Sequence, residues 1–172
     1  MAENILITGY PGVGKTTLIK KLADKLGKYH PIGFYTKEIR KEGIRQGFGL
    51  ASFSGETSVL SHVNFRSRYR VGKYGVDIGG FETFLDSIDF LTPEAGIILI
   101  DEIGKMECYS IKFRDLINEL LNSDKTVITT VAKKGTEFIE KIKSRLDIQI
   151  FTLTLENREC LADQIIDRII GH

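Results

Sequence analysis

The chain has 172 residues, of which 42% are hydrophobic and 27% are charged, a composition typical of one globular domain that would span residues 1–172. Its 24 basic and 23 acidic residues leave a net charge of +1, so no broad positive field exists to attract nucleic acid or an anionic membrane. The three histidines and two cysteines are scattered, which argues against a zinc site, a redox pair or a histidine-based triad.

The first expected element follows a short stretch that lacks the basic start and long apolar run of a signal peptide. Residues 5–8 are apolar and β-branched, which predicts a strand buried on both faces of a parallel sheet. A glycine-rich loop comes next, and leucine and isoleucine side chains over residues 18–26 then share one face of a helix that should end near Gly27. The longest apolar run, residues 97–100, is far too short to cross a bilayer, so we expect a cytoplasmic protein without a membrane partner.

The next segment, residues 31–78, has a different pattern. Residues 32–39 and 44–53 read as strands joined by a turn at 41–43, and a third run at 57–63 follows another short turn. Gaps this short indicate antiparallel hairpins rather than helical crossovers. We therefore interpret the segment as an antiparallel β-hairpin insertion in a parallel core.

Residues 65–71 alternate strictly between basic and other side chains, which as a strand would put Arg66, Arg68 and Arg70 on one face. A nucleic-acid interface would rest on residues 66–73 alone, and a solvated strand face explains the three arginines more simply. A helix over residues 81–91 is expected to follow, with Pro93 just beyond it.

The second half of the chain alternates apolar strand patterns with amphipathic helical patterns. We expect Ser110 and Asn157 to cap the first and the last of these helices. Strands that alternate with helices predict right-handed crossovers and a parallel sheet. The expected strands lie at 97–100, 126–131 and 148–155, and the expected helices at 110–121, 138–146 and 157–170.

The loop after the first strand matches the phosphate-binding pattern G-x-x-x-x-G-K-[ST]. Its glycines allow successive N–H groups to point into one concavity, and the helix that starts here adds its positive dipole end. Lys15 should reach the β- and γ-phosphates, the Thr16 hydroxyl should bind Mg²⁺, and Thr17 should approach the α-phosphate. The matching residues are Gly9-Tyr10-Pro11-Gly12-Val13-Gly14-Lys15-Thr16.

Two acids follow the apolar run at 97–100. In P-loop proteins an acid at this place holds the Mg²⁺ of the nucleotide, and we assign this role to Asp101, through a bridging water. Glu102 is then free to orient or deprotonate the attacking water. Gly104 matches a weaker pattern in which a glycine N–H senses the γ-phosphate, and Lys105 lies either near the phosphates or in solvent.

Two further groups of residues remain open from sequence alone. Thr129 or Thr130 would reach the γ-phosphate or the water only if their strand lies between the loop strand and the Asp101 strand, and ordinary β-propensity explains them more simply. A charge-neutralising arginine is expected in phosphoryl transfer, and the pattern does not choose among several. The candidates are Arg66, Arg68, Arg70, Arg145 and Arg158.

The chain resembles the small P-loop nucleoside triphosphatases first described from thermophilic microbes and also called cancer-related nucleoside triphosphatases. The resemblance rests on residues 9–18, 33–40, 47–48, 101–107 and 157–158. It implies a three-layer α/β fold with a RecA-like, mostly parallel sheet. It also implies slow hydrolysis of NTPs to NDPs and phosphate with broad base tolerance. The implied nucleotide contacts outside the phosphate loop lie in residues 101–107, which include Asp101, Glu102, Ile103, Gly104 and Lys105. Arg158 is a candidate contact on a different ground, because it follows the last strand and either flanks the base or phosphates or lies in solvent.

We therefore predict an Mg²⁺-dependent nucleoside-triphosphatase in which Lys15 and Glu102 are catalytic, while Thr16 and Asp101 hold the metal. The alternative is a small-molecule, nucleotide or RNA-end kinase that uses the same loop. No Asn/Thr-Lys-x-Asp motif for reading guanine occurs in the sequence. We expect a monomer whose partner is the nucleoside triphosphate.

Overall fold

A nine-stranded sheet runs through the computed structural model, which describes residues 3–171. The strands are β1 (Asn4–Gly9), β2 (Ile32–Lys41), β3 (Ile44–Ser52), β4 (Thr57–His62), β5 (Arg70–Val71), β6 (Tyr74–Val76), β7 (Ile97–Ile103), β8 (Thr126–Ala132) and β9 (Ile148–Thr152). The α-helices are α1 (Lys15–Lys25), α2 (Ile78–Asp86), α3 (Ile111–Leu121), α4 (Glu137–Lys143) and α5 (Leu161–Ile170). Short 3-10 turns occur at Gly27–Tyr29 and Glu107–Tyr109.

The strand order is β5-β6-β4-β3-β2-β7-β8-β1-β9. The five strands from β2 to β9 in this order pair in parallel, and those from β2 to β5 pair antiparallel. Strand β2 belongs to both parts, because Ile32–Phe34 pair with β7 while the rest of the strand pairs only with β3. The expected hairpins are confirmed, and the sheet continues through them into β4, β6 and β5.

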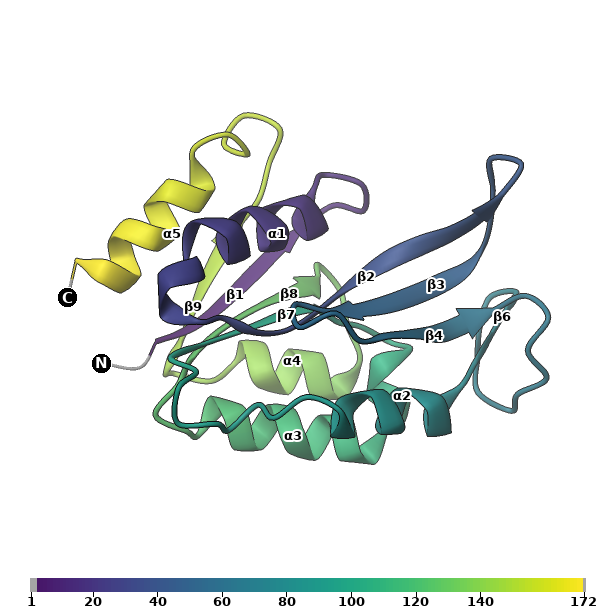
Figure 1. Cartoon of the computed structure of the whole chain (residues 1–172). Helices are drawn as coiled ribbons and strands as arrows, with labels where there is room; N and C mark the ends of the chain where they lie inside the picture. Colours follow the sequence, from purple (N-terminus) through teal and green to yellow (C-terminus); the bar gives the residue numbers. More distant parts are fainter. Residues whose placement is uncertain (1–2, 172) are drawn as a thin grey trace.

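Helices cover both faces of the sheet and make three layers (Figure 1). Helices α1 and α5 lie on one face, and α2, α3 and α4 lie on the other. Each face has its own cluster of buried apolar side chains, one around Leu22 and Ile128 and the other around Phe34 and Phe113. The expected three-layer α/β fold is thus confirmed. Within residues 3–171, every helix is too short or too polar to span a bilayer.

Helix ends agree with the sequence at one predicted cap and differ at another. Ser110 caps α3, since its hydroxyl accepts a hydrogen bond from Phe113 N at 3.0 Å. Asn157 does not cap α5, which begins at Leu161. The Asn157 amide oxygen instead accepts from Thr154 N at 2.8 Å, so the side chain closes a turn before the helix.

The predicted strand over residues 65–71 is wrong except for Arg70–Val71, which pair with β6. The preceding residues have no partner strand, and the Ser67 hydroxyl accepts a hydrogen bond from Tyr69 N in a local turn. The alternation itself is real, because the three arginines are exposed and the residues between them are half-buried. Helix α2 also departs from its expected start at residue 81, because Asp77 accepts from Gly80 N and starts it at Ile78.

Candidate nucleotide-binding site

The phosphate loop joins β1 to α1. Strand β1 is buried because β8 and β9 flank it and helices lie on both faces, so its end is a rigid base for the loop. Gly12 and Gly14 have φ angles of 77° and 108°, a left-handed region that disfavours other residues. Gly14 is the N-cap of α1 and offers no side chain to bond the first turn, so the N–H groups there have no side-chain cap. The loop therefore has the backbone of an anion site.

Lys15 reaches back over this loop. Its Nζ donates to the carbonyl oxygens of Gly9 at 3.1 Å and Tyr10 at 3.3 Å. Within residues 3–171 the ammonium group has no carboxylate partner. A cation held only by neutral carbonyls is free to exchange them for phosphate oxygens.

A cavity of about 1160 Å³ lies over the loop and brings together residues that are far apart in sequence. Most of the predicted site residues line it. They are Gly9, Tyr10, Pro11, Gly12, Gly14, Lys15, Thr16, Thr17, Asp101 and Glu102. The side chains of Val13 and Ile103 are buried, which leaves only their backbone for a nucleotide contact.

Asp101 is the central acceptor of the site and is only 1% exposed. Its Oδ2 accepts from the Thr16 hydroxyl at 2.6 Å and from the Thr36 hydroxyl and N–H at 3.1 and 3.3 Å. Its Oδ1 accepts from the Thr130 hydroxyl at 2.8 Å. Four donors from three other elements thus hold this carboxylate in one orientation.

Two of these threonines enter the site through the strand order. Because β8 lies between β1 and β7, Thr130 comes close to Asp101, as the conditional hypothesis required. Thr36 was not predicted as a site residue. It lies on β2 just after Phe34, the last residue that pairs with β7, so the strands part there. Its only sequence signal is its place in the stretch at 33–40 that carries the family resemblance.

Glu102 and Glu107 form a second acidic group around Gly104. Burial raises the pKa of Glu102, the charge of Asp101 adds to this, and Lys15 opposes it. Burial also raises the pKa of Glu107 to about 8, with Glu102 adding to the effect. A Cβ at position 104 would lie 2.7 Å from Glu107 Oε2 and 3.3 Å from Glu102 Cδ. A larger residue at position 104 would therefore have to displace the carboxyl group of Glu107 from its present position.

A second cavity of about 470 Å³ adjoins the first on the side of Glu102. Gly104 and Lys105 line this smaller cavity and not the larger one. Five residues line both cavities and so mark where the two adjoin: Thr36, Phe48, Glu102, Ala132 and Lys134.

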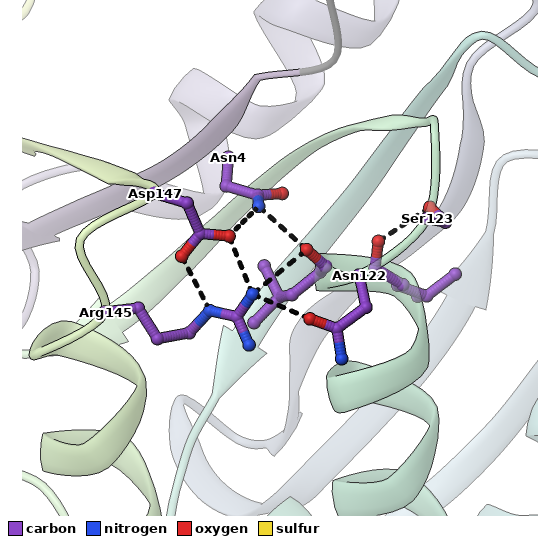
Figure 2. Close-up of polar contacts among 7 residues, drawn as sticks. Asn4, Asn122, Ser123, Arg145 and Asp147 are labelled. Atoms are coloured by element: carbon purple, nitrogen blue, oxygen red, sulfur yellow. Dashed lines mark hydrogen bonds and ion pairs between the residues drawn. The ribbon is translucent and has the colours of Figure 1, made fainter.

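Two of the candidate arginines lie away from the cavity. Arg158 is exposed and pairs with Glu159 at 3.4 Å, so its contact with a nucleotide stays a prediction. Arg145 binds both carboxylate oxygens of Asp147, at 2.9 and 2.7 Å (Figure 2). The same cluster includes Asn4, the first residue of β1. Six strand residues span roughly 17 Å, so Arg145 lies at the wrong end of β1 to reach the phosphate loop.

An Mg²⁺ ion bound with a nucleotide fits the oxygens that meet at the start of α1. The Thr16 hydroxyl and the Asp101 carboxylate lie side by side, and oxygen donors are the ligands that Mg²⁺ prefers. Residues 3–171 contain no group of three or more His, Cys, Asp or Glu side chains able to hold a metal alone. Mg²⁺ at nucleotide sites takes most of its ligands from phosphates and water, so two protein partners suffice.

Comparison with known proteins gives a consistent set of matches. A family model described as NTPase matches residues 4–166. The chain is 45% identical over 163 residues to Nucleoside-triphosphatase THEP1 of Thermotoga sp. (strain RQ2), covering 94% of this chain and 92% of that protein. It is 38% identical to the human Cancer-related nucleoside-triphosphatase, with 96% of both chains covered.

One solved structure gives the same answer for the fold. The crystal structure of THEP1 from the hyperthermophile Aquifex aeolicus matches with a TM-score of 0.88 at 36% identity, covering 97% of this chain and 99% of that one. The names of the Thermotoga and human relatives contain the term nucleoside-triphosphatase and give the kinase alternative no support.

Proposed function

Because this chain belongs to the nucleoside-triphosphatase family, we propose that it hydrolyses nucleoside 5′-triphosphates to the diphosphate and phosphate with the help of Mg²⁺. The observation that carries the proposal is one cavity that Lys15, Asp101 and Glu102 all line. A phosphate-binding loop, a metal-holding acid and a base are the parts that this reaction needs.

Each residue has a role that follows from its surroundings. Lys15 exchanges the carbonyls of Gly9 and Tyr10 for the β- and γ-phosphates. Thr16 and Asp101 hold the metal, which when bound neutralises phosphate charge. Glu102 accepts the proton of the attacking water, and its raised pKa makes it a stronger base than an exposed carboxylate.

We further propose that the site accepts different bases. Tyr10 and Leu155 are 68% and 66% exposed, and both line a hollow beside the phosphate loop. Apolar surface of this kind stacks on any base, whereas discrimination needs several directed hydrogen bonds. The lack of a guanine-reading motif in the sequence supports the same proposal.

The test is phosphate release from ATP and GTP by the purified protein, with Mg²⁺ and with Mg²⁺ chelated. Removing the base in Glu102→Gln should lower kcat by about 10²- to 10⁴-fold and leave nucleotide binding near the parent value. Glu119→Gln, on the exposed face of α3, is the matched control and should behave as the parent. Unchanged hydrolysis in Glu102→Gln would contradict the assignment of Glu102 as the base. Equal activity with and without Mg²⁺ would contradict the proposed role of the metal.

A further inference from the structure

The lining of the two adjoining cavities indicates where negative charge develops on the γ-phosphate during hydrolysis. Glu102 lines both of them, so a water that it activates would meet the γ-phosphate where the two cavities adjoin. The loosened γ-phosphoryl group needs a cation near its outer oxygens at this point. Lys134 is the only cation among the five residues that line both cavities.

The lysines of the larger cavity differ in whether their ammonium groups already contact an aromatic ring or a carboxylate. Lys20 lies over the Tyr35 ring at 4.2 Å and Lys133 over the Tyr10 ring at 3.8 Å, measured to the ring centroids. Lys143 pairs with Glu140 at 3.1 Å. Among the residues from 3 to 171, the ammonium groups of Lys37 and Lys134 make no hydrogen bond, ion pair or ring contact, and of these two lysines only Lys134 also lines the smaller cavity.

The backbone of Lys134, by contrast, is fixed on both sides by α4. Lys143 Nζ donates to the carbonyl oxygen of Lys133 at 2.8 Å. Gly135 N donates to Glu140 Oε1 at 2.9 Å. Lys143 Nζ also donates to Glu140 Oε1 at 3.1 Å, and this bond together with the one from Gly135 N lowers the pKa of Glu140 and keeps it charged. The peptide groups before and after Lys134 are therefore held while its side chain stays free.

No arginine lines either cavity within residues 3–171, so the cations at the site are lysines. We propose that Lys134 neutralises the γ-phosphate in the transition state and that Glu140 and Lys143 position it. This inference rests on the proposed hydrolysis. It assigns to a lysine the charge-neutralising role for which the sequence pattern had offered only arginines as candidates. A group held in place before the reaction needs no reorganisation during it, which is how such a charge lowers a barrier.

The first test compares Lys134→Ala with Lys134→Arg under saturating ATP and Mg²⁺. Lys134→Ala should lower kcat by about 10²- to 10³-fold with a KM change of less than about threefold, and arginine should recover most of the rate. The matched control is Lys141→Ala, which removes an exposed lysine of α4, the helix that follows Lys134, and should keep the parental rate. A Lys134→Ala rate within about twofold of the parent would overturn the proposal.

A second readout separates a catalytic role from a structural one. ADP with aluminium fluoride imitates the transferring phosphoryl group, so Lys134→Ala should bind it at least about tenfold more weakly and bind ADP alone normally. Equal weakening of both would overturn the proposal. Glu140→Gln should lower kcat by a smaller factor, about tenfold, with ADP binding intact. If the parent itself releases no phosphate, the proposed function fails; if only the Lys134 variants match the parent, this inference alone fails.

Discussion

The two ends of β1 carry polar clusters of opposite character. At the amino end, the Arg145 guanidinium bonds both oxygens of Asp147 as well as the Leu121 carbonyl and the Asn122 side chain (Figure 2). At the carboxyl end, Lys15 is held by neutral carbonyls alone. The comparison indicates that a charged side chain with a structural role is paired with an opposite charge in the chain, whereas one that binds a ligand keeps its charge unpaired until the ligand arrives.

Lys15→Ala removes the unpaired cation at the carboxyl end of β1 and should have the largest effect on hydrolysis. Loss of the phosphate cation should lower kcat/KM by about 10³-fold or more and weaken nucleotide binding. Phosphate release and nucleotide titration measure the two effects. Lys25 lies on the same helix as Lys15, and Lys25→Ala, which removes an exposed ion pair with Asp163 of α5, should leave both unchanged. Normal activity in Lys15→Ala would contradict the site as a whole.

Thr130→Val tests how far the donors around Asp101 matter. The substitution keeps the shape of a fully buried side chain but removes the hydrogen bond to Asp101 Oδ1. A buried acceptor left without its donor costs about 1–3 kcal/mol, so we expect lower stability and about tenfold slower hydrolysis. Thr129→Val is the matched control, because this equally buried hydroxyl makes only a 3.4 Å contact with a neighbouring carbonyl. Equal effects in both variants would contradict the special role of Thr130.

The buried carboxyl group of Glu107 makes stability depend on pH in a direction that can be checked. Its pKa is raised from 4.5 to about 8, so between these values the folded protein keeps a proton that the unfolded chain has lost. The free energy of unfolding should therefore fall as pH rises from 5 to 8, by at most about 1.4 kcal/mol per pH unit from this group. Glu107→Gln removes the ionisation. Urea unfolding at pH 5 and pH 8 should show a smaller pH effect in the variant, and identical effects would contradict the assignment.

Arg145→Ala tests the structural side and should have the smallest effect. Hydrolysis should match the parent, because the cluster lies at the far end of β1. Stability should fall by about 1 kcal/mol, since Arg145 and Asp147 are partly exposed and water screens their attraction. Thermal unfolding and phosphate release check the two expectations together. A loss of activity without a loss of stability would mean that the two clusters communicate.

The parts of the site that sequence predicts are those whose geometry is local. The phosphate loop is eight consecutive residues, and Asp101 and Glu102 directly follow an apolar strand. Because these residues are consecutive in the chain, their type and spacing predict the local backbone geometry, and the neighbouring strands and helices need not be known. The parallel core and the hairpins follow from periodicity and gap length in the same way.

The residues that sequence did not assign depend on strand order and packing. Thr36 meets Asp101 only because β2 pairs with β7 and then leaves it. Lys134 has its place only because two residues of α4 hold the neighbouring peptide groups. The alternation at 65–71 correctly predicted which side chains are exposed, but a strand also needs a partner, and most of this stretch has none.

The position of β1 in the sheet has a consequence for how the protein is made. Both of its neighbours come from the last third of the chain, because Asn4 lies opposite Val127 of β8 and Ile148 of β9. The hairpins from β2 to β4, by contrast, join residues close in sequence and can form early. During synthesis β1 therefore has neither partner strand until β8 and β9 have been made, and the phosphate loop that follows β1 gains its fixed base only then.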